Sequence, residues 1–516
     1  MIVEDQSEVI EFLESPDAHR GARVERVDTH TAVVFLASGR ALKLKRAVRF
    51  DYVDFSTADR RRSACEAELR VNRRTAPAIY RSVLPVTRAA DGALALGGEG
   101  TPIDWVVEMA RFDQDELLDR LAAAGRLDLA LMRPLADAIA AFHGDARPRP
   151  DHGGAAGLRW VIDGNATGFA DEGRDILDVD RAADVTARAA AELERQTERL
   201  ERRRRDGCVR ECHGDLHLRN IVRIDGRPVL FDAIEFNDDI SCIDTLYDIA
   251  FLLMDLWRRR LPAHANAVCN GYVAERDEIG DLALLPLFLS CRAAVRAKTS
   301  ASAARVQEDA AARRRLEDTA REYLAMAGEL LRPPAPRLVA IGGLSGTGKS
   351  TLALRLAPAL GAAPGALVLR SDEIRKALCG VGRLEPLGPG GYDDAVTARV
   401  YRTLIARAAV GVAAGRAVIA DAVFRRQQDR VAIEQVAAAA GVPFDALWLT
   451  APDDVLMRRV AARTGDPSDA TADIVRWQLA QRIGDLTWSP LDASRVPDRV
   501  TDDATALLGA RAGSRA

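Results

Sequence analysis

The chain has 516 residues, of which 48% are hydrophobic and 29% charged, and its formal net charge at pH 7 is −4. This length predicts two or three domains with hydrophobic cores of ordinary size. The near-neutral charge excludes bulk electrostatic attraction to nucleic acid or to a membrane surface as the basis of function.

The terminus and the cysteines predict a cytoplasmic protein. No apolar run approaches the ~20 residues of a membrane span, and the acidic N-terminus lacks the regions of a secretory signal. The seven cysteines are scattered, and only Cys208 and Cys212 lie close together. Without a second pair at zinc-ligand spacing, we interpret them as ordinary thiols in a reducing compartment.

The first 330 residues predict a small β-rich lobe followed by a larger helical lobe. Residues 30–48 alternate like two strands joined at Ser38-Gly39, residues 59–75 have the composition of a charged helix, and residues 103–112 predict a further strand. From about residue 115 helices dominate, with one strand-loop-strand stretch at 207–236. This order is typical of a bilobal α+β domain.

A proline-rich linker, residues 331–336, separates this domain from the next. Prolines disfavour a continuing helix and favour an extended connection. Beyond the linker, short apolar runs predict strands that alternate with helices, as in a parallel α/β sheet. These strands are expected at residues 337–342, 366–370, 416–421 and 445–450. We therefore predict domains at 1–330 and 337–505, with a disordered tail at 506–516.

The second domain opens on "GLSGTGKS", which fits the P-loop pattern G-x-x-x-x-G-K-S. It lies between an apolar strand and a helix-forming run, so its backbone N–H groups and the helix N-terminus can cradle phosphates. Lys349 is expected to reach the β- and γ-phosphates of ATP, and the Ser350 hydroxyl to ligate Mg²⁺. The predicted nucleotide-binding residues are Gly343, Ser345, Gly346, Thr347, Gly348, Lys349, Ser350 and Thr351.

Other residues of this domain have the chemistry of phosphoryl transfer. Asp372 follows the second strand and is a candidate base for an acceptor hydroxyl, although Ser371-Asp372 could simply cap a helix. Asp421 ends the third strand, where a carboxylate can hold the metal. Arg459 and Arg463 lie four residues apart, so they could clamp a phosphate or form a solvated helix face.

The Walker A motif, "SDEIRK", "VIADAVF" and "RRVAAR" with "DPSDA" together resemble the small P-loop kinases grouped with zeta toxins, chloramphenicol phosphotransferase and polynucleotide kinase. The resemblance spans about residues 337–480. It implies transfer of the ATP γ-phosphoryl group to a hydroxyl. Acceptors vary widely in that group, so the resemblance does not identify one.

The first domain contains a second set of residues suited to phosphoryl transfer. In "CHGDLHLRNIV", Asp215 and Asn220 have the spacing of a kinase catalytic loop, in which the Asp takes the acceptor proton and the Asn holds Mg²⁺. Asp232 in "VLFDAIEF" occupies the position of a second metal ligand, without the glycine of D-F-G. His213 is expected to be structural, and Asp248 either orients this loop or caps its helix.

A kinase also needs a lysine on a strand of its small lobe and a helical glutamate to pair with it. Lys43 and Lys45 share one strand face, and we choose Lys43. Of Glu66 and Glu68 we choose Glu68, with a solvated helix charge as the alternative. The strand "VVEMARF" is interpreted as the hinge between the lobes. Backbone groups of Glu108 to Ala110 would meet adenine there, unless it is simply a buried strand.

This domain resembles the aminoglycoside phosphotransferase-like kinases over about residues 25–300. The whole chain looks like bacterial two-domain proteins in which such a kinase is fused to a P-loop kinase. The resemblance implies a bifunctional ATP- and Mg²⁺-dependent phosphotransferase acting on small-molecule hydroxyls, for example of a sugar or sugar phosphate. Two alternatives stay open: one domain is a nucleotide sensor that regulates the other, or the P-loop domain phosphorylates an RNA 5′-hydroxyl. The lack of a basic, aromatic-rich stripe argues against RNA.

Overall fold

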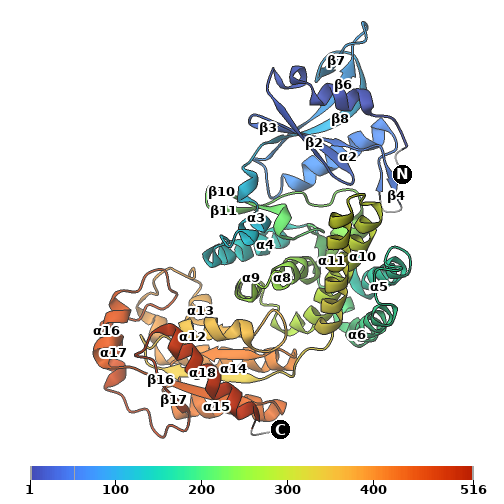
Figure 1. Cartoon of the computed structure of the whole chain (residues 1–516). Helices are drawn as coiled ribbons and strands as arrows, with labels where there is room; N and C mark the ends of the chain where they lie inside the picture. Colours follow the sequence, from blue (N-terminus) through green and yellow to red (C-terminus); the bar gives the residue numbers. More distant parts are fainter. Residues whose placement is uncertain (1–2, 51–52, 514–516) are drawn as a thin grey trace. The chain divides into compact units, whose positions relative to one another are not determined.

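The computed structural model describes residues 3–50 and 53–513, and the chain divides into two compact units, whose elements are labelled in Figure 1. The first unit comprises residues 1–171 and 186–255, and the second comprises 172–185 and 256–516. Residues 256–330 therefore group with the P-loop sheet, although we assigned them to the first domain. The predicted domain boundaries stay a prediction.

A six-stranded antiparallel sheet forms the β-rich lobe of the first unit. Its order is β1 (Val24–Asp28), β2 (Ala32–Ala37), β3 (Arg40–Lys45), β8 (Thr101–Ala110), β6 (Tyr80–Arg88) and β7 (Leu94–Leu96). Successive side chains of a strand point to opposite faces. Accordingly, Val106 packs in the cluster that contains Leu13 of α1 (Ser7–Glu14), whereas Val107 packs with Cys65 of α2 (Ala58–Asn72). One helix thus covers each face.

Helices build the rest of the first unit, around two short antiparallel pairs of strands. The longer helices are α3 (Leu118–Ala123), α4 (Met132–Asp145), α5 (Gly154–Ala170), α6 (Val179–Arg205) and α8 (Thr245–Arg258). The paired strands are β9 (Val209–Glu211) with β12 (Cys242–Asp244), and β10 (Ile221–Ile224) with β11 (Arg227–Leu230). Residues 212–220 connect β9 to β10, so the predicted catalytic loop lies between two anchored strands.

The second unit contains a five-stranded parallel sheet. Its order is β14 (Leu367–Arg370), β15 (Val418–Asp421), β13 (Leu338–Gly343), β16 (Phe444–Thr450) and β17 (Ser489–Asp492). The central strand β13 is buried at all six positions, as expected where helices cover both faces of a parallel sheet. The helices around it include α12 (Lys349–Leu356), α13 (Ser371–Leu378), α14 (Asp394–Ala413), α15 (Gln427–Ala440), α16 (Asp453–Ala461) and α17 (Ala472–Leu479).

Two C-terminal elements differ from the sequence prediction. We did not predict β17, which is a short edge strand. Helix α18 (Pro497–Gly513) runs through residues 506–513 of the predicted disordered tail, because Ala504 and Leu508 are buried in the core of the P-loop sheet. Residues 514–516 of that tail lie outside the described residues.

Helix α9 (Pro262–Arg276) explains why residues beyond 255 group with the P-loop sheet. The side chain of Asn270 accepts a hydrogen bond from Val368 N at 2.7 Å and donates one to Ala366 O at 3.1 Å. Asn266 donates to the same carbonyl oxygen at 3.0 Å. Since β14 is an edge strand, these bonds satisfy backbone groups that a sheet edge leaves open. Helices α10 (Leu285–Val306) and α11 (Ala310–Leu330) follow in the chain.

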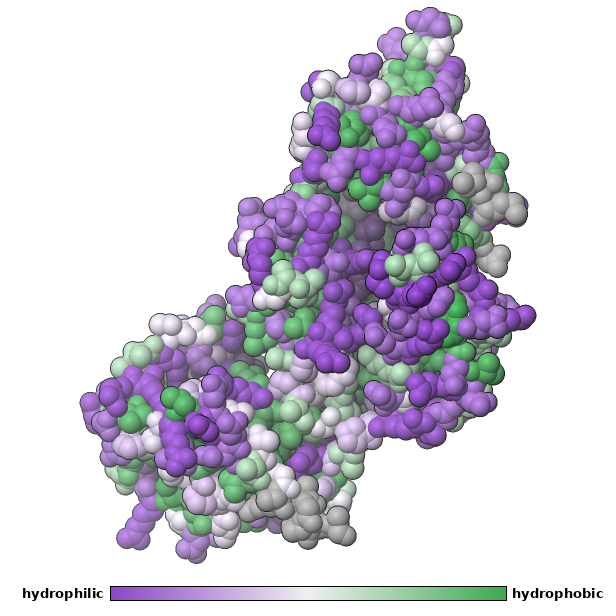
Figure 2. Space-filling view, in the orientation of Figure 1, coloured by the Kyte–Doolittle hydropathy of each residue, from purple (hydrophilic) through white to green (hydrophobic). Residues whose placement is uncertain are grey.

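The surface has the mixed character of a water-exposed protein. Figure 2 shows hydrophilic side chains over most of the visible face of each unit, with hydrophobic residues interspersed. Among the described residues, no helix combines the length and apolarity needed to cross a bilayer.

Candidate active sites

The first unit places two lysines and three carboxylates in one network, which is buried at Glu68 and Lys45 and 43% exposed at Asp232. Lys43 Nζ donates to Glu68 Oε1 at 2.7 Å and to Asp232 Oδ1 at 2.6 Å. Lys45 Nζ donates to Glu68 Oε2 at 2.7 Å and pairs with Glu235. Glu68 is thus shared by both lysines, and only Lys43 reaches the predicted metal ligand Asp232. The choice of Lys43 over Lys45 as the lysine that positions ATP stays a prediction.

Burial and charge oppose each other in this network. Burial of the Glu68 carboxyl disfavours its charged form, but the two lysine ammonium groups outweigh burial and lower the pKa of Glu68 to about 2. Burial also disfavours the charged form of Lys43, yet Asp232 and Glu68 raise its pKa well above the usual value. Burial raises the pKa of Glu235, against the opposing effect of Lys45. Glu66 lies on the exposed side of α2 and pairs with Arg62 at 2.9 Å.

The loop between β9 and β10 brings Asp215 and Asn220 together. Asn220 Nδ2 donates to Asp215 Oδ2 and to the Asp215 carbonyl oxygen, each at 3.0 Å. His217 Nε2 lies 3.3 Å from the same carboxylate oxygen. Asn220 is buried, whereas the side chain of Asp215 is 36% exposed. This arrangement holds a carboxylate at the surface in a fixed orientation.

Asp248 anchors the start of this loop. Its carboxylate accepts hydrogen bonds from His213 N at 3.1 Å and from Gly214 N at 2.9 Å. It also lies 3.0 Å from His143 Nε2. His213 Nε2 is bonded to the Phe231 carbonyl oxygen at 2.9 Å, next to Asp232. Of the two readings of Asp248, orientation of the loop is the one that these contacts support, and His213 has structural contacts.

The predicted hinge residues, Glu108 to Ala110, lie at the end of β8, where Glu108 and Ala110 form contacts within the lobe. Ala110 N donates to Ile79 O at 2.8 Å. The Glu108 carboxylate pairs with Arg40 at 2.9 Å and accepts from Ser82 Oγ at 2.7 Å. The Ala110 amide is therefore already used in this structure, and the adenine contact at Glu108 to Ala110 stays a prediction.

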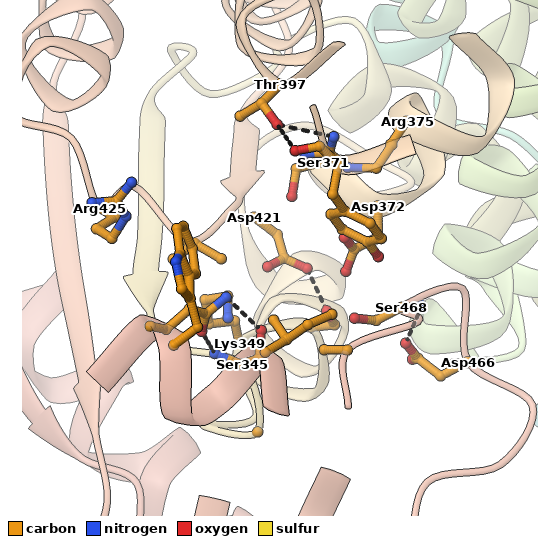
Figure 3. Close-up of a pocket in the computed structure, with 18 of the residues that line it drawn as sticks. Ser345, Lys349, Ser371, Asp372, Arg375, Thr397, Asp421, Arg425, Asp466 and Ser468 are labelled. Carbon is orange, nitrogen blue, oxygen red and sulfur yellow. Dashed lines mark hydrogen bonds between the residues drawn. The ribbon is translucent and has the colours of Figure 1, made fainter. Parts of the chain in front are cut away.

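The P-loop borders a cavity of about 550 Å³, within the range of small-molecule sites (Figure 3). Six of the predicted nucleotide-binding residues line this cavity, namely Ser345, Gly346, Gly348, Lys349, Ser350 and Thr351. Gly343 has φ 139°, and a Cβ there would lie 2.6 Å from Leu449 O. Only glycine fits that backbone position without strain.

Two side chains of the P-loop, those of Ser350 and Lys349, form hydrogen bonds near the predicted metal and phosphate sites. Ser350 Oγ donates to Asp421 Oδ2 at 2.5 Å. Lys349 Nζ donates to the Leu344 carbonyl oxygen at 3.0 Å, and burial lowers its pKa. Burial likewise raises the pKa of Asp421, although Arg370 and Lys349 oppose it. The site therefore has a desolvated lysine beside a hydroxyl and a carboxylate, which are oxygen ligands that suit Mg²⁺.

Asp372 lies in the first turn of α13 and lines the same cavity. In Figure 3 it projects toward the space that Asp421 faces from the end of β15. The residue that caps α13 is Arg370, without a side-chain capping bond, so the alternative role of Ser371 as the cap is wrong. Ser371 is instead the first residue of the helix.

The two arginines predicted as a phosphate clamp share one pocket, but only Arg463 also lines the larger cavity. Arg463 lines the large cavity and also a second pocket on the other side of the P-loop. Arg459 lines only the second pocket, where its Nη1 donates to Ala493 O at 2.8 Å. Residues four apart share a helix face, but α16 ends at Ala461, which frees Arg463 to turn toward the cavity. The expectation that both arginines lie on one helix face is therefore wrong, and their role as a phosphate clamp stays a prediction.

Sequence reasoning missed several residues of both sites. Glu235 completes the lysine network, and only its position three residues after Asp232 could have suggested it. Gln478 exchanges hydrogen bonds with Ser345 at 2.8 and 3.1 Å. Arg375 follows Asp372 by one helical turn and lines the cavity. The sequence could have indicated Arg375 only through its position three residues after the candidate base Asp372, which places both on one helix face.

Comparisons with known proteins match two separate regions of the chain, the first of which extends beyond the first structural unit. Residues 34–281 match the family described as the phosphotransferase enzyme family, and residues 338–483 match the family described as an AAA domain. The uncharacterized protein Rv2004c of Mycobacterium tuberculosis is 31% identical over 423 residues, which cover 79% of this chain and 80% of that protein.

Two solved structures are also similar. A choline/ethanolamine kinase family protein from Mesorhizobium loti has 14% identity and a TM-score of 0.36, covering 63% of this chain and 99% of its own. A sugar kinase from Janibacter has 23% identity and a TM-score of 0.26, covering 34% of this chain and 95% of its own.

Proposed function

We propose that this chain has two separate active sites. The chain belongs to a family of two-domain proteins in which a phosphotransferase enzyme family domain precedes a P-loop domain, and it is thus a kinase. Each site transfers the γ-phosphoryl group of ATP to a hydroxyl of a small molecule, such as a sugar or a sugar phosphate. One observation supports this most: each unit has its own partly buried lysine, its own oxygen ligands and its own accessible carboxylate.

In the first unit, Lys43 is the cation for the ATP phosphates, and Glu68 fixes its ammonium group. Asp215 accepts the proton of the acceptor hydroxyl as the bond between that oxygen and the γ-phosphorus forms. The bond from the γ-phosphorus to the bridging oxygen breaks, and ADP leaves with that electron pair. Asn220 holds Asp215 in position through the 3.0 Å hydrogen bond.

In the second unit, Lys349 and the backbone of residues 343–350 bind the phosphates, and Arg463 approaches the γ-phosphoryl group. The pocket that contains Arg459 lies across the P-loop and suits the base and ribose, since both pockets share Gly346, Gly348 and Thr351. Asp372 takes the acceptor proton, with the same bonds formed and broken.

The oxygen ligands of both sites fit Mg²⁺. Ser350 and Asp421 would hold it in the P-loop unit, and Asn220 and Asp232 would hold it in the first unit. Bound there, Mg²⁺ neutralises charge on the β- and γ-phosphates.

Single-site variants test the proposal. Asp215→Asn and Asp372→Asn should each abolish one set of phosphorylated products from a metabolite library and leave the other set, with losses of about 10²- to 10⁴-fold. Asp502→Asn, an exposed position of α18, is the matched control. A product set that neither variant changes would contradict the two-site proposal.

A further inference from the structure

Arg375 is a buried guanidinium without an anionic partner. The residue is 6% exposed, and it lines the P-loop cavity from α13. Its Nη1 donates to two neutral oxygens, Gly391 O at 2.8 Å and Thr397 Oγ1 at 3.2 Å. Its Nε is buried without any hydrogen-bond partner. Among residues 3–50 and 53–513, no carboxylate forms an ion pair with it.

An unpaired buried charge is costly, and proteins usually avoid it. Two other arginines of the same cavity form ion pairs, Arg426 with Asp394 and Arg463 with Asp466 at 4.0 Å. Arg375 differs from these two arginines. An unsatisfied guanidinium that faces a cavity is a site prepared for an anion from outside, because its planar donors match a carboxylate or phosphate.

A second arginine borders the same space. The guanidinium carbon of Arg425 lies 5.1 Å from the ring centre of Trp477. Among the described residues no salt bridge to Arg425 is found, although the nearby charge of Asp429 interacts with it. Arg375 lies 4.7 Å from the ring of Tyr392 in the same manner. Trp477 and Tyr392 are 55% and 40% exposed, and both line the cavity. Exposed aromatic faces of this kind suit the apolar face of a small organic acceptor.

The candidate base, Asp372, and the candidate anion-binding residue, Arg375, lie on the same helix. Asp372 and Arg375 are three residues apart on α13, so their Cβ atoms lie about 5–6 Å from each other on one face. Figure 3 shows Asp372, Arg375 and Arg425 around the cavity above Lys349. A hydroxyl at Asp372 and an anionic group at Arg375 can therefore belong to one small molecule.

We propose that the acceptor of the P-loop unit carries a carboxylate or phosphate group besides its reacting hydroxyl, and that Arg375, helped by Arg425, binds this group. This inference rests on the proposed kinase function of the same cavity, and it narrows the acceptor class to hydroxy acids and phosphorylated alcohols or sugars.

The test uses the full chain with Asp215→Asn, so that turnover comes from the P-loop site. Phosphorylated product is measured with matched acceptors: gluconate against glucitol, and glucose 6-phosphate against glucose and glucosamine. The anionic member should have a kcat/KM about tenfold higher or more. Arg375→Met and Arg425→Met should each reduce that preference, and Arg375→Lys should restore part of it. Arg402→Met, at an exposed position of α14 outside the cavity, is the matched control.

Equal kcat/KM for charged and neutral acceptors, or preference for glucosamine, would overturn the anion site and leave the kinase function standing. An anion preference that both methionine variants retain would overturn the role of these arginines. If no acceptor is phosphorylated, the kinase proposal fails for this unit, and equilibrium dialysis of labelled gluconate and glucose 6-phosphate decides the anion site. Binding that Arg375→Met weakens about tenfold supports it, and absence of binding refutes it.

Discussion

Replacing Glu68 by Gln removes the one carboxylate that both buried lysines share. Glu68 is fully buried and lies 2.7 Å from each lysine Nζ. Breaking a buried ion pair by removing one partner costs about 3–5 kcal/mol. The lowering of its pKa from 4.5 to about 2 gives a similar figure, about 3 kcal/mol. We expect Glu68→Gln to destabilise the first unit by about this amount.

The assay is urea unfolding, followed by hydrogen exchange of α2 and the β-rich lobe. A loss of that size lowers the midpoint by roughly 1–5 M urea. In an Asp372→Asn background, which leaves only the first site, the KM for ATP should also rise, because Lys43 loses the group that orients it.

Glu66→Gln is the matched control, since it changes the same residue type on the same helix. The side chain of Glu66 is 53% exposed, and its pair with Arg62 is a surface ion pair. Such pairs contribute about 0–1 kcal/mol. If the two variants unfold at the same urea concentration and have the same KM for ATP, the reasoning from burial and shared charge is refuted.

Three further outcomes are expected. First, the stability that ionised Glu68 supplies is fully present above pH 4.5 and is lost as the pH falls through a folded pKa of about 2. The difference in urea midpoint between wild type and Glu68→Gln should therefore become smaller from pH 5 to pH 3. A difference that stays constant would contradict this. Second, Asp421→Asn should raise the Mg²⁺ concentration for half-maximal turnover of the P-loop site by about 10- to 100-fold, measured with Asp215→Asn, whereas an unchanged Mg²⁺ curve would exclude Asp421 as a ligand. Third, Arg203→Met should lower the free energy of unfolding in urea by about 3–5 kcal/mol, because Arg203 is buried and donates hydrogen bonds to Asp244 at 2.7 and 2.8 Å. Arg205→Met, at an exposed position, is the control and should have little effect. Equal losses in the two variants would argue against the buried pair.

The sequence predicted the parts of each site that depend on local chain geometry. The P-loop needs glycines at fixed spacing, and Gly343, Gly346 and Gly348 all have positive φ in the structure. The spacing of Asp215 and Asn220 likewise predicted their proximity, because five residues of one loop can close a hydrogen bond. The pairing of Glu68 with a strand lysine was predicted from the chemistry of kinases and agrees with the contacts.

Contacts between distant segments were beyond sequence reasoning. Lys45 and Glu235 are separated by 190 residues, and no local pattern records which carboxylates meet in space. The run "ERRRRD" at residues 201–206 has the composition of a solvated helix end, yet Arg203 within it is buried against Asp244. Strand β17 begins Ser-Pro and is only four residues long, so neither propensity nor alternation indicated it.

The two lysines differ in a way that bears on ligand binding. Lys43 already has two carboxylates within hydrogen-bond distance, so arriving ATP phosphates must share or displace Asp232. Lys349 has only a carbonyl oxygen, and burial lowers its pKa. Arg375 in the same cavity also has only neutral partners. Incoming anions in the P-loop unit would therefore meet cations that hydrogen-bond to neutral oxygens, although Asp421 and Asp372 also act on Lys349 through their charge. In the first unit, incoming phosphates would instead exchange one carboxylate partner of Lys43 for another anion.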